Sequence, residues 1–267
     1  KGSGTMKIAV LVKQVPDMES KFKIIGDSKI DESQIAFKMN DFDEYAVEAA
    51  LQLKEKFGGE VIIISAGPER ASKEIRQAFA MGGDWGIQIQ DEQVDAGDNF
   101  VVASALCKAV ESLGGVDLVL TGVQAEDDQA AVTGVMIADM LGMPHCTNVV
   151  KIEVGGDGKS MTVNRELEGG LNEVLEIAMP AVLTIQSGIN QPRYPTLPGI
   201  MKAKKKRLDV KKAADLGVSA VGEAGSKTKF VKMFFPVSDH KAEIIEGDPK
   251  SAAAKLVDKL RNEAKVI

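Results

Sequence analysis

The chain has 267 residues, a formal net charge of −6, 44% hydrophobic residues and two cysteines. This composition suffices for a large buried core and excludes both a disulfide-stapled scaffold and a cysteine-based metal cluster. Because no apolar run is long enough to span a bilayer and no signal-like segment opens the chain, we expect a cytoplasmic protein with no membrane insertion and no nucleic-acid partner. Residues 1–5, which precede Met6, look like a cloning remnant and are left out of the fold prediction.

Residues 6–144 alternate short β-branched runs with helical periods, as expected for a parallel sheet covered by helices. A buried strand at 7–13 is followed by a polar excursion with a small hairpin at 22–30. The first helix begins at Asn40 or Asp41, where Asp41 and Glu44 have the spacing of a capping box, and it ends at Gly58-Gly59. The alternation then continues with strands at 60–66, 86–90 and 117–121 and helices at 70–81, 99–113 and 129–141.

After Pro144 the pattern changes to antiparallel strands joined by glycine-containing turns. We expect these strands at 149–154, 160–166 and 173–178, followed by a continuous apolar strand at 181–186. The predicted fold class is therefore α/β, a doubly wound, mostly parallel sheet with antiparallel edge strands.

The last part of the chain has weak periodicity from 209 onward, and 222–229 reads as a flexible link. A helix starts at Asp248-Pro249 and places Ala253, Leu256, Val257 and Leu260 on one face. We expect one α/β domain over 6–208 and an extended C-terminal arm over 209–267.

Residues 188–208 combine a proline-punctuated loop with a basic run. Pro192, Pro195 and Pro198 each fix φ, which predicts an ordered protrusion that is neither helix nor central strand, with Leu197 at its tip. The run Lys202–Arg207 adds positive charge to an acidic chain. An apolar anchor beside a basic patch suits transient docking to an acidic surface, whereas the simpler reading is a solvated lysine-rich face.

Three turns meet where ligands bind in doubly wound sheets, beyond the carboxyl ends of the strands. These turns are 12–14, 66–68 and 121–128, and the helix near Gln129 adds unpaired N–H groups that suit an anion. Taken singly, such residues are more often caps and turns than ligand contacts. Because G-x-G-x-x-G is missing after the first strand and Gly158–Ser160 reads as a hairpin turn, the residues alone predict only a nucleotide-sized crevice.

The sequence offers little for catalysis. His145 and His240 are its two histidines, the carboxylates show no pairing signal, and no nucleophile arrangement or metal cluster can be argued from spacing. We expect no catalytic residue and no metal, which is typical of a carrier component.

Three stretches carry a family resemblance: KIAVLVKQVPD at the N-terminus, NRELEGGLNEVLEIAMPAVLTIQSGIN, and NQPRYPTLPGIMKAKKKRL. Together they resemble the electron transfer flavoprotein β subunit over nearly the whole chain. The resemblance implies an α subunit as partner, which holds most of the FAD, with Arg165 and Glu166 of this chain beside the flavin. It also implies that the C-terminal segment embraces that partner, and that electrons pass from acyl-CoA or amine dehydrogenases to a quinone-linked oxidoreductase. The implied docking residues are Leu197, Pro198, Ile200, Met201 and Lys202.

In relatives that are not electron bifurcating, the crevice holds a structural AMP, whereas in bifurcating relatives it holds a second FAD. The resemblance implies the following ligand contacts: Leu11, Asn40, Asp41, Phe42, Asp43, Ala66, Gln124, Asp128, Gln129, Ala130, Ala131, Val132, Thr133 and Gly134. Bifurcating forms tend to read D-G-D-T-A-Q-V-G in this loop, while this chain reads DDQAAVTG over 127–134, which favours AMP. The acidic pair 127–128 is unfavourable beside a phosphate unless it caps the helix or faces solvent.

Three alternatives stay open at this point. One is a bifurcating subunit with a second FAD that oxidises NADH. Another is a stand-alone adenine-nucleotide-binding or hydrolysing module, and the third is a structural interaction protein whose crevice binds nothing.

Overall fold

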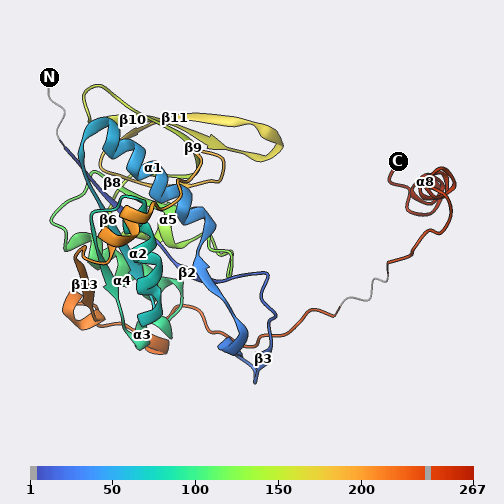
Figure 1. The fold of residues 1–267 in the computed structure, drawn as a ribbon, viewed down its shortest axis with the longest axis horizontal. Coiled ribbons are helices and arrows are strands. Elements are labelled where there is room, and N and C mark those ends of the chain that lie inside the picture. Colours follow the sequence, from blue (N-terminus) through green and yellow to red (C-terminus); the bar gives the residue numbers. More distant parts are fainter. Residues whose placement is uncertain (1–4, 238–241) are drawn as a thin grey trace.

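A nine-stranded sheet forms the centre of the computed structural model, which describes residues 5–237 and 242–267 (Figure 1). Its strand order is β11-β10-β9-β12-β8-β1-β6-β7-β13. The antiparallel pairs are β9 with β10 and β10 with β11, while all other neighbours run parallel, so the predicted fold class is confirmed. The strands are β1 (Met6–Leu11), β6 (Gly59–Ala66), β7 (Trp85–Ile89), β8 (Leu118–Gly122), β9 (His145–Val154), β10 (Ser160–Glu166), β11 (Asn172–Ala178), β12 (Ala181–Ile185) and β13 (Leu208–Lys211).

Helices cover both faces of this sheet. They are α1 (Asp41–Phe57), α2 (Ser72–Met81), α3 (Glu92–Asp95), α4 (Asn99–Glu111), α5 (Thr133–Leu141), α6 (Leu197–Ala203), α7 (Gly222–Gly225) and α8 (Pro249–Asp258). Single 3₁₀ turns lie at Glu32–Gln34, Glu69–Ala71, Glu168–Gly170 and Ala213–Leu216, and a π turn at Lys259–Glu263 follows α8. In the polar excursion, β2 (Gln14–Pro16) pairs with β5 (Phe37–Met39), and β3 (Ile24–Ile25) pairs with β4 (Lys29–Ile30), as the predicted hairpin requires.

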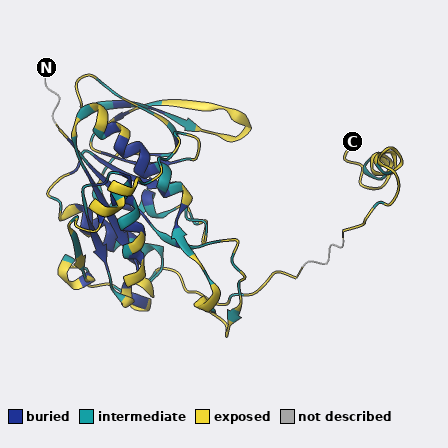
Figure 2. Cartoon of the chain, viewed as in Figure 1, coloured by how far each residue is buried: buried dark blue, intermediate teal, exposed yellow. Residues whose placement is uncertain are grey.

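Alternate residues of the central strands enter two separate cores, because successive side chains of a strand point to opposite faces (Figure 2). Ile8 and Ile63 pack with α1 and α2 on one face. Ala9 and Ile62 pack with α4 and α5 on the other. Burial on both faces explains why these strands read as continuous apolar runs in the sequence.

The strand order reverses between β1 and β8. From β1 the chain passes through α1 to β6 and through α2 to β7 on one side. It then returns through α4 to β8 on the other side of β1. The switch point of the sheet therefore lies at the carboxyl ends of β1 and β8, where a crevice is expected.

The segment 188–208 differs from its prediction, because Leu197–Ala203 forms helix α6. The Thr196 hydroxyl caps this helix by accepting a hydrogen bond from the Gly199 N–H at 3.1 Å. Pro198 lies in the first turn, where a missing N–H leaves no intrahelical bond unmade. The prediction of a protrusion without helix was wrong, since it read Pro198 as a breaker and not as an N-terminal helix residue.

Residues after 208 also differ from the expected arm. Leu208–Lys211 is the edge strand β13 beside β7, and the expected flexible link at 222–229 is packed. The Asp98 carboxylate accepts hydrogen bonds from the Lys227 and Thr228 N–H groups, each at 2.8 Å, which fixes the end of this link to the start of α4. Only then does the chain leave the body as an extended tail that ends in α8 (Figure 1).

Two of the sequence expectations fall partly outside the described residues, namely the remnant at 1–5 and His240. Among the helices that the structure describes, none has both the length and the hydropathy needed to cross a bilayer. Over the same residues, no group of three or more potential metal ligands comes together.

Candidate functional site

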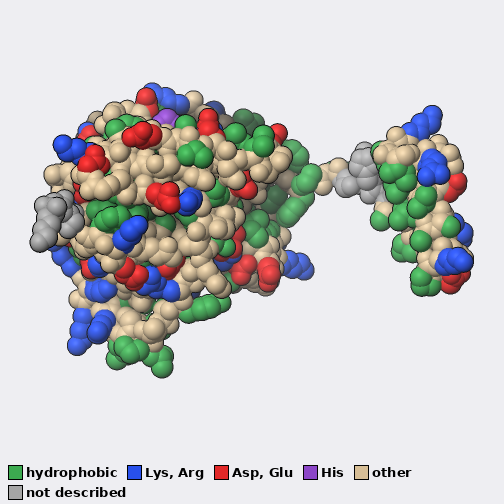
Figure 3. All heavy atoms as spheres, turned by 90° about the horizontal axis from the view of Figure 1, so that it is seen from above, with side chains coloured by type: hydrophobic (Ala, Val, Ile, Leu, Met, Phe, Trp, Pro, Cys, Tyr) green, Lys and Arg blue, Asp and Glu red, His purple; other side chains and the backbone are tan. Residues whose placement is uncertain are grey.

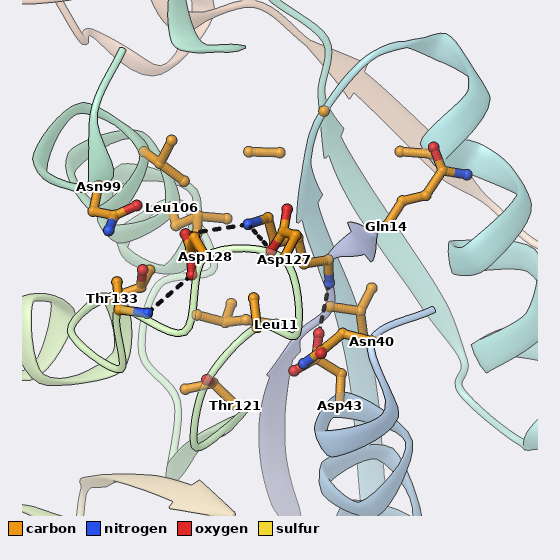
Figure 4. A pocket seen from close by; sticks show the side chains of 18 of the residues that line it. Leu11, Gln14, Asn40, Asp43, Asn99, Leu106, Thr121, Asp127, Asp128 and Thr133 are labelled. Carbon is orange, nitrogen blue, oxygen red and sulfur yellow. Dashed lines mark hydrogen bonds and ion pairs between the residues drawn. The ribbon is translucent and has the colours of Figure 1, made fainter. Parts of the chain in front are cut away.

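A cavity of about 550 Å³ lies at the switch point, beyond the carboxyl ends of β1, β6 and β8 (Figure 4). Its walls include apolar side chains from β1 and α4, polar side chains from α1, and the loop between β8 and α5. Most of the predicted cofactor residues line it: Leu11, Asn40, Asp43, Ala66, Gln124, Asp128, Ala130, Ala131, Val132 and Thr133.

The other predicted cofactor residues, Asp41, Phe42, Gln129 and Gly134, lie outside this lining. Asp41 instead pairs with Lys38 at 2.7 Å on the surface of α1. Gly134 is needed for packing, because a Cβ there would lie 2.7 Å from Cγ2 of Thr184. This glycine lets the start of α5 approach the sheet closely.

Sequence reasoning missed several residues of the cavity, among them Lys13, Gln14, Arg70 and Asn99. Arg70 stacks over the Phe37 ring at 4.1 Å and pairs with Glu32 at 3.2 Å, so the excursion 14–39 closes over one side of the cavity. A local signal existed for Lys13, which directly follows the first strand. Arg70 comes to the cavity only through its contacts with this distant excursion.

Asp43 holds two edges of the cavity together. Its buried carboxylate accepts hydrogen bonds from the N–H of Lys13 at 2.7 Å and from the N–H of Gly122 at 3.0 Å. These donors follow β1 and end β8, so Asp43 fixes the two strands that flank the switch point. Burial raises the pKa of Asp43 to about 7, against the effect of these hydrogen bonds, which favour the ionised form.

Asn40 precedes α1 but does not cap it. Its side-chain amide donates to the Gln124 carbonyl at 2.9 Å, and its carbonyl oxygen accepts from the Glu126 N–H at 3.1 Å. The predicted capping box of Asp41 and Glu44 is therefore wrong, because α1 begins at Asp41 with Asn40 at the cap position and Asn40 spends its side chain on a distant loop. The consequence is a firm attachment of the loop after β8 to the start of α1.

The loop before α5 has an unusual backbone. Gln129 and Ala131 adopt left-handed φ values of 50° and 55°, and α5 begins at Thr133, four residues later than predicted. Among the described residues, no side chain caps α5. Its first N–H groups lack intrahelical partners, and left-handed residues alternating with other conformations form concave nests of N–H donors. This part of the cavity wall is therefore suited to an anion.

The acidic pair of this loop is neutralised locally. The Lys13 ammonium lies 2.7 Å from Oδ1 of Asp127 and 3.3 Å from Oδ2 of Asp128. Oδ1 of Asp128 also accepts a hydrogen bond from the Ala130 N–H at 3.1 Å. The two carboxylates thus have cationic and backbone partners, which removes the main objection to an anion nearby.

Arg165 and Glu166, predicted to lie beside a flavin, end strand β10 on the antiparallel side of the sheet. A register shift between Asn164 and Arg165 marks a bulge at this point. The Arg165 guanidinium lies 3.6 Å from Glu173 of β11. Neither Arg165 nor Glu166 belongs to the switch-point cavity.

The predicted docking residues present an apolar surface on α6. Leu197 is 80% exposed and Met201 66% exposed, with Ile200 and Lys202 also exposed. Tyr194, which sequence reasoning missed, is 91% exposed just before this helix.

Part of the basic run is not free to steer a partner. Lys206 donates to the carbonyls of Phe79, at 3.1 Å, and Gly83, while Arg207 pairs with Asp209. Burial lowers the pKa of Lys206. The predicted steering role of Lys206 and Arg207 is therefore corrected, and Lys202, Lys204 and Lys205 remain as the exposed cations of the run.

Comparison with known proteins agrees with this architecture. The family model of the electron transfer flavoprotein domain matches residues 27–216. The chain is 37% identical over 258 residues to the electron transfer flavoprotein subunit beta of Methylophilus methylotrophus, covering 94% of this chain and 97% of that protein. It is 36% identical over 263 residues to the subunit beta of Bacillus subtilis, covering 98% of this chain and all of that protein. Against the subunit beta of Bradyrhizobium diazoefficiens the identity is 40% over 266 residues, covering 98% of this chain and all of that protein.

The matches span both the switch-point cavity and α6, and they extend over nearly the full length of the relatives. The chain belongs to the electron transfer flavoprotein family, as a beta subunit that takes part in electron transfer.

Proposed function

We propose that this chain pairs with an α subunit and carries electrons from acyl-CoA or amine dehydrogenases to a quinone-linked oxidoreductase. In this proposal the α subunit holds most of the FAD, and the switch-point cavity of this chain holds a structural AMP. The observation that carries the proposal is that cavity. Its volume of about 550 Å³ and its position at the switch point are typical of a nucleotide site in an α/β fold.

The lining fits an adenylate in its chemistry. Leu11, Leu106 and Val123 supply apolar walls for a flat base, and the loop at 129–133 supplies backbone donors for a phosphate. Lys13 lines the same cavity and offers the phosphate a cation. A single phosphate matches this small set of anion donors better than the longer pyrophosphate of a second FAD.

The proposal gives β10 a place beside the flavin of the α subunit. Bound FAD supplies the one-electron and two-electron chemistry of the complex. On this chain, the bulge before Arg165 turns its guanidinium and the exposed Glu166 carboxylate to the edge of the sheet. Charged side chains at that edge would orient the flavin and the mobile part of the partner that carries it.

The tail is proposed to be the arm that binds the α subunit. It exposes Phe230, Val231, Phe234 and Phe235, and α8 exposes Leu256 and Val257. Figure 3 shows hydrophobic side chains on the lobe beyond the grey segment. Aromatic side chains exposed at this density mark an interaction site, because monomeric proteins rarely leave them in water.

Docking to the dehydrogenase is proposed to use the surface of Tyr194, Leu197 and Met201. The partner is expected to offer an apolar pocket with an acidic rim, because Lys202, Lys204 and Lys205 surround this surface with positive charge. A small contact of this kind releases quickly, as an electron carrier requires.

The test is the Leu197→Ala variant in the purified heterodimer, with Val210→Ala as the control. Val210 is an exposed apolar residue on β13, outside α6. Burying a leucine side chain stabilises a contact by about 1.5–3 kcal/mol, so L197A should lower kcat/KM for reduction by the dehydrogenase about 10-fold to 100-fold. Nucleotide content and heterodimer formation should not change. Equal rates for L197A and wild type would contradict the docking role.

A further inference from the structure

The segment 186–207, which connects β12 to β13, is attached to the body at three points around helix α6. None of these attachments lies in the exposed apolar surface of α6. Their arrangement concerns how that surface is held, and the inference drawn from it rests on the proposed docking function.

The first attachment lies before the helix, where Arg193 meets α1. Its Nε and Nη2 donate to the two carboxylate oxygens of Glu48 at 2.7 and 3.0 Å, and its backbone N–H donates to the same carboxylate at 3.2 Å. Nη1 also donates to Glu55 at 2.5 Å. A guanidinium that forks onto a carboxylate fixes orientation as well as distance.

Glu48 makes this attachment sensitive to change. Its side chain is almost fully buried, and burial alone would raise its pKa. The hydrogen bonds from Arg193 and Gln52 outweigh burial and hold the pKa of Glu48 below its usual range. Breaking a buried pair of this kind leaves one charge in the core without compensation, which is strongly unfavourable.

The second attachment is a close backbone contact. A Cβ on Gly199 would lie 2.5 Å from the Ala80 carbonyl oxygen of α2, a distance that no side chain tolerates against backbone. Gly199 therefore sets how closely α6 packs on α2, and a larger residue would push the helix outward.

The third attachment is reciprocal capping. Arg76 of α2 donates from Nη1 to the carbonyls of Ala203 and Lys206, each at 2.7 Å, at the carboxyl end of α6. Lys206 in turn donates to the Phe79 carbonyl at 3.1 Å, near the carboxyl end of α2. Cations at these ends satisfy free carbonyls and favour the helix dipoles.

We propose that Arg193 with Glu48, Gly199 and Arg76 are positioning residues that hold α6 in the orientation that the dehydrogenase binds. They act through α6 and not by contact with the donor. When the binding-competent orientation falls to a fraction of the population, the apparent dissociation constant rises by the inverse of that fraction. Loss of an attachment should therefore raise KM for the heterodimer and leave kcat nearly unchanged.

The experiment compares the heterodimer variants Arg193→Lys, Glu48→Gln and Gly199→Ala with wild type. Lys108→Gln, which breaks a surface ion pair of 2.6 Å on α4, is the matched control, and Leu197→Ala reports on docking itself. Each heterodimer is reduced by an acyl-CoA dehydrogenase with its acyl-CoA and, in parallel, by an amine dehydrogenase with its amine. Hydrogen exchange of peptides covering 194–206 and reduction by dithionite are measured on the same samples.

R193K and E48Q should raise KM about tenfold with kcat within about twofold, because the lysine cannot form the fork and the glutamine cannot hold the charge. Amides of α6 should exchange faster in both variants, and dithionite reduction should match wild type. G199A should give the same split, and it keeps the test decisive if a variant of the buried pair fails to fold. K108Q should behave as wild type.

The outcomes separate this inference from the proposed function. If L197A slows reduction while R193K, E48Q and G199A keep the wild-type KM, the positioning role is overturned and docking through α6 stands. If L197A matches wild type, or if neither donor reduces the wild-type heterodimer, the proposed function itself is overturned.

Discussion

Replacement of Asp43 by alanine should loosen the switch point without touching the docking helix. The change removes the acceptor for two N–H groups, those of Lys13 and Gly122. A buried donor left without an acceptor costs about 1–3 kcal/mol, so the two together should lower the free energy of unfolding by about 2–5 kcal/mol. Asp41→Ala is the control, because the Asp41 carboxylate is more than half exposed and its pair with Lys38 should contribute less than about 1 kcal/mol.

The assay is urea denaturation of the purified heterodimer, followed by hydrogen exchange of peptides that cover β1 and β8. D43A should lose protection in both peptides together, since one carboxylate holds both strands. Its AMP content should also fall relative to D41A. A D43A heterodimer within about 1 kcal/mol of wild type, with β1 and β8 fully protected, would refute the reasoning.

Three further predictions concern pH, the arm and a backbone contact. Because the pKa of Asp43 is about 7 in the folded chain and 3.8 in the unfolded chain, its contribution to stability is fully present below about pH 4 and is lost as pH rises through 7. The D43A penalty, measured by urea unfolding, should thus be larger at pH 5 than at pH 8, and a constant penalty would contradict the assignment. Asp98→Ala should destabilise the start of α4 by about 1–2 kcal/mol and speed proteolysis near 226–229, unless this carboxylate does not anchor the arm. Gly59→Ala should lower the thermal midpoint far more than Gly114→Ala, since both have positive φ but only at Gly59 would a Cβ collide, 1.9 Å from the Met6 oxygen; equal shifts would argue against the contact.

The doubly wound sheet could be predicted because local signals and global packing agree there. The apolar runs at 7–11 and 60–66 are strands buried on both faces, and glycines end the helices that connect them. The switch point follows from this alternation alone. For the same reason, the turns at 12–14, 66–68 and 121–128 could be assigned to one crevice before any side chain was placed.

The details of the crevice depend on tertiary contacts that a local pattern does not contain. Asn40 has the composition of a cap, but it bonds the Gln124 and Glu126 backbone across the cavity. That attachment accompanies the left-handed conformations of Gln129 and Ala131, which delay the start of α5 to Thr133. Asparagine and aspartate side chains satisfy either a local or a distant backbone group, and sequence alone does not say which.

The docking segment was mispredicted for a related reason. Proline within a run usually argues against helix, yet the first turn of a helix accepts it, and Thr196 provides the cap. Lys206 belongs to a run of like charges and still faces inward, because α2 offers it free carbonyls. Charge runs therefore identify a basic segment but do not tell which of its members remain available to a partner.

The most direct test of this account is the nucleotide content of the purified heterodimer. Acid extraction followed by chromatography should release one FAD and one AMP per heterodimer if the switch-point cavity holds an adenylate. Two FAD per heterodimer, or FAD with no second adenine nucleotide, would contradict that assignment.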